Sequence, residues 1–349
     1  MALTNTIKSP DVSVLMPVFN GARWLQQSID SIRNQSLTDF ELIIVDDGST
    51  DDSYLIAANL ARLDDRIRVV RQAHSGVATA LNHGITLSKS KFIARMDADD
   101  IAHRERLQKQ FSAFRECPRI GALGSWARVI DEQGRSLREL KPEINPTELH
   151  KSLIKQNPFI HSSMMFSADL VQYLGGYRAA LDGAEDYDLW LRMSEHAPLA
   201  NIPELLISLR HHATSASVTL NLKQLLAARL ARMSAAQRRV LKRDIVEQLH
   251  APLSLDELGE YQEFRHISNF YRLLARSPSE TVDGNYFRCF WHLRLNHAER
   301  KTAQLWLTKA IKGSSSNGFR ASAFFWLFCL HPARALSLMW SLTKAQKSS

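Results

Sequence analysis

Two aspartates at the end of an apolar run are the first residues in this sequence that could do chemistry. Asp97 and Asp99 stand two apart in M-D-A-D-D at 96–100, directly after the apolar part of K-F-I-A-R-M at 91–96. In an extended chain, side chains two residues apart point the same way, and two carboxylates so close repel each other unless a cation lies between them. Oxygen ligands of this kind suit Mg²⁺ or Mn²⁺, which commonly bridge a diphosphate. The alternative is a solvated turn in which Asp100 caps the next helix.

A second acidic pair ends another apolar run. The segment V-D-D-G-S-T-D-D-S at 45–53 places Asp46 and Asp47 at the end of an expected strand. A strand–turn–helix junction with Asp51 or Asp52 as the helix cap explains the glycine and the later acids. It does not explain why the strand itself should end in two acids.

A third acidic stretch, G-A-E-D-Y-D-L-W-L-R at 183–192, predicts a helix that begins near Glu185. Acids in the first turn of a helix interact favourably with its dipole, and this structural reason by itself is sufficient for Glu185, Asp186 and Asp188. The same dipole predicts a lowered pKa for Asp186, which would keep its carboxylate ionised at neutral pH.

Alternating β-rich and helix-period runs in the first half of the chain predict the scaffold for these acids. We expect strands at 12–16, 40–46, 67–70 and 91–96, with helices between them and after the last strand. Apolar side chains at helical spacing mark the first and the last of these helices (Leu25, Ile29, Ile32; Leu107, Phe111, Phe114). This order predicts an α/β fold with a doubly wound, mostly parallel sheet. Ligands of such sheets bind beyond the carboxyl ends of the strands, where Asn20, Asp46, Asp47, Asp97 and Asp99 follow their strands.

The composition sets limits on the class of protein. Hydrophobic residues make up 45% and charged residues 23% of the 349, which is typical of a globular chain. Three widely separated cysteines exclude a disulfide scaffold and a thiolate zinc site. The first twenty residues lack the pattern of a signal peptide, and no apolar window of about 18 residues suggests a spanning helix.

The net charge of +8 is divided unevenly along the chain. Residues 1–220 hold 24 Lys and Arg against 27 Asp and Glu, whereas residues 221–349 hold 20 against 9. We therefore expect two domains, an α/β domain over 1–220 and a basic, mostly α-helical C-terminal region over 221–349.

Four ordered motifs resemble the family 2 glycosyltransferases of the GT-A fold. They are V-S-V-L-M-P-V-F-N-G-A-R-W-L, I-I-V-D-D-G-S-T-D-D-S, the run from H-S-G-V-A-T-A-L-N-H-G to A-R-M-D-A-D-D, and E-D-Y-D-L-W-L-R. The resemblance covers about residues 11–215, and it implies a GT-A-type sheet, a nucleotide-sugar donor and a divalent cation, Mn²⁺ or Mg²⁺. The sequence departs from the family where Leu81 replaces the usual Arg and His74 stands in place of a common Asn.

The resemblance also implies roles on the donor side. Asp47 would accept the uracil N3 hydrogen, while Asp97 and Asp99 would hold the cation on the diphosphate and contact the ribose. The residues implied in binding the nucleotide sugar are Pro17, Val18, Asn20, Asp46, Asp47, Asn82 and Asp97.

On the acceptor side, the family uses the Asp of an E-D pair as general base, which makes Asp186 the candidate and leaves Asp188 a structural role. Similar enzymes often carry one His that reaches the metal or diphosphate, and in L-R-H-H-A-T-S we expect it to be His211. An exposed loop would equally explain the two adjacent histidines. His161 and Glu185 could line the acceptor pocket, although a buried core histidine is an equal alternative for His161.

These features predict an inverting, metal-dependent glycosyltransferase. It would move one sugar per encounter from a nucleotide sugar, most simply a UDP-sugar, to a glycan or lipid-linked acceptor in surface polysaccharide or lipopolysaccharide synthesis. The Q-x-x-R-W motif of processive synthases does not occur. The alternatives are a non-catalytic sugar-nucleotide-binding protein and a nucleotidyltransferase, although P-V-F-N-G-A-R lacks the glycine-rich phosphate loop that the latter would need.

The last 49 residues raise the question of a membrane partner. Residues 301–349 contain seven Lys or Arg and no acid, together with A-F-F-W-L-F-C-L at 323–330 and L-S-L-M-W-S-L at 336–342. Trp326 and Trp340 are of a type favoured at membrane interfaces, so we expect a cytoplasmic protein that docks on the inner face of the cytoplasmic membrane through anionic lipid. The alternative is that these aromatics pack a helical subdomain. No recognised motif supports a nucleic-acid partner.

Overall fold

The structure is a computed structural model that describes residues 9–212, 222–247, 249, 256–257, 265–275, 295–313, 323, 326–327, 330 and 335. The first half forms the expected parallel strands β1 (Val12–Val18), β2 (Phe40–Asp46), β3 (Ile67–Arg71) and β4 (Phe92–Arg95). Every residue of β1 and β2 is buried, which explains why these strands appear in the sequence as continuous apolar runs.

The sheet continues beyond β4 with strands that the sequence analysis did not identify. Its order is β3-β2-β1-β4-β8-β6-β9-β5, with β7 (Ser136–Leu140) paired to β6. The added strands are β5 (Ile101–Ala102), β6 (Ala122–Ile130), β8 (Met165–Ser167) and β9 (Leu199–Arg210). β8 runs antiparallel to β4 and β6, whereas β6 and β9 pair in parallel. The α/β class and the mostly parallel sheet are confirmed.

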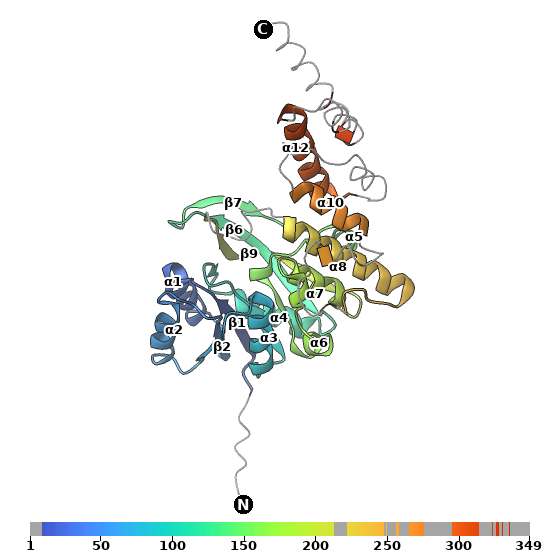
Figure 1. The fold of residues 1–349 in the computed structure, drawn as a ribbon. Coiled ribbons are helices and arrows are strands. Elements are labelled where there is room, and N and C mark those ends of the chain that lie inside the picture. Colours follow the sequence, from blue (N-terminus) through green and yellow to red (C-terminus); the bar gives the residue numbers. More distant parts are fainter. Residues whose placement is uncertain are drawn as a thin grey trace, which may run out of the picture. The chain divides into compact units, whose positions relative to one another are not determined.

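Helices cover both faces of the parallel strands. Figure 1 shows α1 (Ala22–Arg33) and α2 (Ser53–Ala61) on one side of β1 and β2, and α3 (Val77–Leu87) on the other. α1 buries Leu25, Ile29 and Ile32, as their spacing predicts. The remaining helices of this half are α4 (Arg106–Glu116), α5 (Pro146–Lys155), α6 (Ala168–Tyr173) and α7 (Glu185–Met193), with short 3₁₀ turns η1 (His161–Ser163) and η2 (Ala179–Leu181).

The chain divides into two compact units, and the first includes a segment beyond residue 220. Unit 1 is Met1–Leu220 with Ala227–Ala251, and unit 2 is Asn221–Leu226 with Pro252–Ser349. The helix α8 (Leu222–Leu241) carries most of the later segment of unit 1. Side chains join this segment to the earlier part of the unit: Arg178 Nη2 donates to Asp244 Oδ2 over 2.7 Å, and Arg238 Nη2 lies 2.9 Å from Glu195 Oε1. Residues 227–251 group with the earlier part of the chain. The functional boundary expected at residue 220 stays a prediction.

In unit 2 the described residues are largely helical, in α10 (Arg265–Ala275) and α12 (His297–Gly313). The buried Glu299 carboxylate accepts from Tyr271 Oη and from the backbone NH of Asn296, which fixes the start of α12 against α10. None of the described helices combines the length and the apolar content needed to span a bilayer.

Trp326 is 7% exposed and therefore belongs to the interior of unit 2. This burial favours the packing alternative for that residue over a place at a membrane interface. Trp340, the whole run 336–342 and half of the run 323–330 lie outside the described residues.

Candidate active site

Three carboxylates converge just beyond the end of β4. Asp97, Asp99 and Asp100 each offer an oxygen, and these oxygens all lie within 4.8 Å of one another. Asp100 is 3% exposed, and its Oδ1 accepts the backbone NH of Arg210 over 2.8 Å. It caps no helix, because α4 begins only at Arg106. The solvated-turn alternative is therefore wrong for Asp100.

Cationic or ionisable partners surround this acidic cluster. The buried Arg95 forms an ion pair with Asp97 Oδ2, and His212 Nε2 lies 2.8 Å from Asp99 Oδ2. His211 is exposed and its backbone NH donates to Ile130 O. The structure thus places His212, and not the expected His211, at the acidic cluster, while a metal-side role of a histidine stays a prediction.

The electrostatics of the acidic cluster suit a hard divalent cation. Burial, together with the neighbouring Asp99, raises the pKa of Asp97 although Arg95 opposes the shift. Burial and the charges of Asp97 and Asp99 raise the pKa of Asp100 well above its usual range. A cation among these oxygens would offset the repulsion and would be bound by the ligand type that Mg²⁺ and Mn²⁺ prefer. The residues present therefore fit such an ion.

Asp47 holds the loop that follows β3. Its carboxylate is 3% exposed and accepts from Gln72 Nε2 at 2.7 Å and from the backbone NH groups of Ser75 and Gly76, each at 2.9 Å. His74 Nδ1 lies 2.9 Å from its Oδ2. The expected contact between Asp47 and uracil stays a prediction. A uracil ring that bound there would share the carboxylate with the hydrogen bonds that already anchor residues 72–76.

Asp46 has a structural partner of its own at the end of β2. The Oδ1 atom of Asp46 accepts the backbone NH of Ser49 at 3.1 Å and lies 3.2 Å from Arg71 Nε. Asp51 Oδ1 in turn accepts the backbone NH of Ser53, which begins α2. The strand–turn–helix junction is thus present, with Asp52 at the N-cap position but without a side-chain cap bond. The bonds of Asp46 and Asp47 to the loops after β2 and β3 give a structural reason for two acids at the end of β2.

The loop after β1 presents an aromatic ring that the sequence analysis overlooked. Pro17 and Val18 are buried within β1, while Asn20 is exposed, has a φ of 52° and accepts the backbone NH of Thr50 at 2.8 Å. Between them Phe19 is 48% exposed and stacks on His74 with ring centroids 4.0 Å apart. A lone aromatic directly after a buried strand was the available signal for this ring.

Asn82 binds backbone rather than facing open solvent. Its Nδ2 donates to Tyr177 O and its Oδ1 accepts from Tyr177 N, both over 2.8 Å. The preceding Gly176 has a φ of 74°, and a Cβ built there would lie 2.3 Å from Asn82 Oδ1. This paired contact ties α3 to the turn 175–177, which borders the expected acceptor side.

Asp186 lies in the first turn of α7, which begins at Glu185 as predicted. Its Oδ2 accepts from Asn157 Nδ2 at 2.8 Å, and its Oδ1 accepts the backbone NH of Tyr187 at 2.6 Å. Burial raises the pKa of Asp186 in spite of these bonds. The expected lowering by the helix dipole is therefore wrong, because desolvation of the carboxylate outweighs the stabilisation at the helix end.

Two other ionisable groups expected on the acceptor side, Glu185 and His161, have shifted pKa values. Burial and the charge of Asp186 raise the pKa of Glu185 to about 7. His161 Nε2 lies 2.9 Å from Tyr177 Oη, and burial together with Arg95 lowers the pKa of this imidazole well below its usual range. Asp188 is fully buried, 2.8 Å from Arg192 Nη2, in the structural role expected for it.

Arg95 connects the two halves of the site. Burial raises the pKa of Asp97, Asp186 and Tyr177, and the positive charge of Arg95 opposes each of these rises. One buried cation therefore acts electrostatically both on the acidic cluster and on the carboxylate at the start of α7.

Comparison with known proteins decides the family. Residues 13–174 match the family described as glycosyl transferase family 2. The chain is 36% identical over 210 residues to the O-antigen biosynthesis glycosyltransferase WbnJ of Escherichia coli, a match that covers 58% of this chain and 81% of that protein. It is 34% identical to the amylovoran biosynthesis glycosyltransferase AmsE of Erwinia amylovora, over 57% of this chain and 75% of the relative. The chain is a family 2 glycosyltransferase.

The fold of this family 2 glycosyltransferase agrees with a solved relative. The crystal structure of Staphylococcus aureus TarS 1–349 in complex with UDP-GlcNAc aligns with a TM-score of 0.58 at 14% identity, over 94% of this chain and 92% of that one. The likeness supports the GT-A-type architecture, which confirms the resemblance noted in the sequence.

Proposed function

We propose that this glycosyltransferase moves one sugar, with inversion at its anomeric carbon, from a UDP-sugar to a hydroxyl of a glycan or lipid-linked acceptor. The setting we propose is surface polysaccharide or lipopolysaccharide assembly. Support comes from the similarity to WbnJ of O-antigen biosynthesis and AmsE of amylovoran biosynthesis, and from the UDP-GlcNAc that TarS binds.

The proposal rests above all on the convergence of Asp97, Asp99 and Asp100 beyond β4, with His212 against Asp99. We propose Asp97, Asp99 and His212 as the residues that hold Mn²⁺ or Mg²⁺. When bound, the cation would offset the charge that develops on the departing diphosphate. Arg95 would keep Asp97 oriented toward this position through their ion pair.

Asp186 is the proposed general base. In a direct displacement it takes the proton of the acceptor hydroxyl while that oxygen attacks C1 of the sugar, through a transition state with oxocarbenium character. The amide of Asn157 and the backbone NH of Tyr187 orient its carboxylate for this step. No covalent intermediate is needed, so a single base suffices.

The test is Asp186→Asn, which keeps the shape of the side chain but removes its capacity to accept the proton. We expect turnover to fall at least about a hundredfold, the size usual for loss of a general base, with UDP affinity measured by calorimetry unchanged. Asp169→Asn is the matched control, because Asp169 is an exposed acid in the first turn of α6. Unchanged turnover in Asp186→Asn would exclude the role, and a wild-type protein that binds UDP-sugars without turnover would favour the non-catalytic alternative.

A further inference from the structure

Arg210, the last residue of β9, is an arginine almost completely enclosed beside the acidic cluster. It is 5% exposed, and its Nε donates to the carbonyl oxygen of Asp99 over 3.0 Å. Its Nη1 donates to the carbonyl oxygens of Asp131 and Glu132, at 3.2 and 3.1 Å, in the turn between β6 and β7.

The same side chain reaches α1. Arg210 Nη2 donates to Gln27 Oε1 over 2.6 Å, and the guanidinium carbon lies 5.6 Å from the centre of the Trp24 ring. The ring of His212 also lies against Trp24, with the two ring centroids 4.4 Å apart. The guanidinium of Arg210 therefore joins α1, the turn between β6 and β7, and the acidic segment, residues 97–100, that carries the acidic cluster.

The backbone of Arg210 adds a further bond to the acidic segment. Its NH donates to Asp100 Oδ1, and two residues later His212 reaches Asp99 Oδ2. The guanidinium itself binds the main chain of Asp99 and leaves that carboxylate to other partners. This is the arrangement expected of a group that fixes the position of ligands without occupying them.

We propose that Arg210 is a positioning residue that holds Asp99, Asp100 and His212 in the arrangement that binds the divalent cation of the donor complex. The inference rests on the proposed metal-dependent function. Three neighbouring carboxylates repel one another and tend to separate, so a rigid main chain is needed to keep their oxygens together. A planar guanidinium can bind several acceptors in fixed directions, which a lysine ammonium cannot reproduce.

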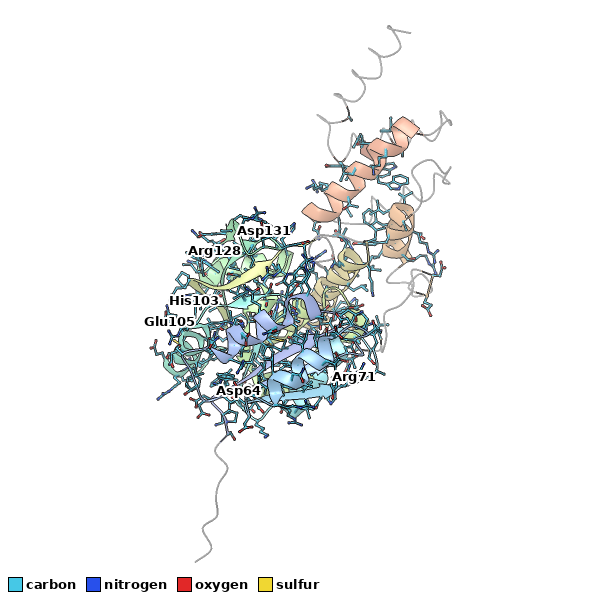
Figure 2. All side chains as sticks on the ribbon, turned by 90° about the vertical axis from the view of Figure 1, so that its left-hand side faces the viewer. Asp64, Arg71, His103, Glu105, Arg128 and Asp131 are labelled. Atoms are coloured by element: carbon cyan, nitrogen blue, oxygen red, sulfur yellow. The ribbon has the colours of Figure 1, made fainter. Side chains whose placement is uncertain are left out.

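A merely structural arginine elsewhere in unit 1 supplies the control. Arg66 stacks on Phe40 at 4.3 Å, donates to Arg33 O over 3.1 Å and pairs with Asp64. Figure 2 shows Asp64 well apart from Asp131, whose carbonyl Arg210 binds. Arg66→Lys therefore removes the same kind of contact at a distance from the acidic cluster.

The experiment compares the full-length wild type with Arg210→Lys, Arg66→Lys and Asp99→Ala. Mn²⁺ binding is measured from the electron paramagnetic resonance signal of the free ion, with and without UDP, and thermal midpoints are recorded alongside. We expect Arg210→Lys to weaken Mn²⁺ binding at least about tenfold, and Arg66→Lys to leave it within about twofold of the wild type. Wild-type affinity in Arg210→Lys, or an equal loss in both lysine variants, would overturn the inference.

A milder variant keeps the inference testable if Arg210→Lys does not fold. Gln27→Met removes only the exposed acceptor of Arg210 Nη2, and we expect a loss of Mn²⁺ affinity of about two- to fivefold; no loss there counts against the proposal. If the wild type itself binds no Mn²⁺, the proposed metal dependence fails. If the wild type binds and Asp99→Ala does not, while the Arg210 and Gln27 variants bind normally, only the role of Arg210 fails.

Discussion

Glu185 and Asp186 are adjacent acids in the first turn of α7, and Glu185 is buried there. Glu185 is 8% exposed, and its Oε2 accepts the backbone NH of Gly183 over 2.8 Å. Its pKa is raised from 4.5 to about 7 by burial and by Asp186. The folded protein therefore binds a proton that the unfolded chain has released between about pH 4.5 and 7, and the free energy of unfolding falls as the pH rises through this range.

Glu185→Gln should remove this penalty while it keeps an acceptor for Gly183. We expect the variant to unfold in urea with nearly wild-type stability at pH 5 and with greater stability at pH 8, by at most about 3 kcal/mol, the free energy equivalent to the full shift. Urea titrations at the two pH values measure the difference. A variant that is less stable than the wild type at pH 8 would contradict the sign of the shift.

Residue types and positions were sufficient to predict the acids of the site, but not the histidine. Asp97, Asp99 and Asp186 follow from acids at the expected element ends and from the family motifs. His211 and His212 are adjacent, and only the direction of the chain after β9 decides between them. Since Arg210 is buried, the period of two in an extended chain places His212 on its side and His211 in solvent.

At the scale of elements, α3 and the turn after α6 depend on one close approach. Asn82 binds both backbone groups of Tyr177, and the absence of a side chain at Gly176 makes room for it. The hydroxyl of Tyr177 in turn contacts His161 Nε2. α3 is therefore linked through Tyr177 to His161, a residue of the proposed acceptor side.

Gly176→Ala should disrupt this close approach for two reasons. The new Cβ would lie 2.3 Å from Asn82 Oδ1, and alanine is strained at the positive φ of this position. We expect a loss of about 2–4 kcal/mol in the free energy of unfolding, from strain and overpacking together. Gly175→Ala is the matched control, since its φ is 75° but no atom lies within 4 Å of the added Cβ. It should lose only about 1 kcal/mol. Equal losses in urea titrations would show that the approach of Asn82 is unimportant.

The predicted elements agree with the structure where burial is continuous and local. β1, β2 and the apolar face of α1 have local apolar patterns that identify them whichever elements pack against them. β6, β8 and β9 were not predicted, because their pairing joins segments far apart in the chain. In β9 the exposed Glu204 interrupts the apolar pattern, and strand preference of this kind depends on the neighbouring strands more than on the residues themselves.

At the scale of the whole molecule, the surplus of positive charge in residues 221–349 is the feature that still points to a surface partner. Ala303 and Leu307 on α12 are buried, so deletion of 301–349 would remove packing together with charge. Charge substitutions at exposed positions separate the two effects. Lys301 and Lys309 are exposed on this helix.

We expect the wild type to float with strongly anionic liposomes at low salt and to be released as salt rises, since attraction to anionic lipid is worth about 1 kcal/mol per basic residue near the surface. Lys301→Glu with Lys309→Glu should weaken flotation severalfold. Lys151→Glu with Lys155→Glu, exposed on α5, changes the net charge equally and should have little effect. A wild type that stays unbound, or an equal loss in both double variants, would contradict docking through this region.

The pairing of Arg178 with Asp244 has a consequence for the order of events during synthesis. Arg178 and Glu195 are translated well before their partners Asp244 and Arg238. A nascent chain that has emerged only as far as residue 220 therefore contains every proposed catalytic residue, yet Arg178 in that chain has only the more distant carboxylate of Asp188 and lacks that of Asp244. Because unit 1 includes residues 227–251, we expect its packing to be completed only after these residues have left the ribosome, although none of the proposed catalytic residues lies among them.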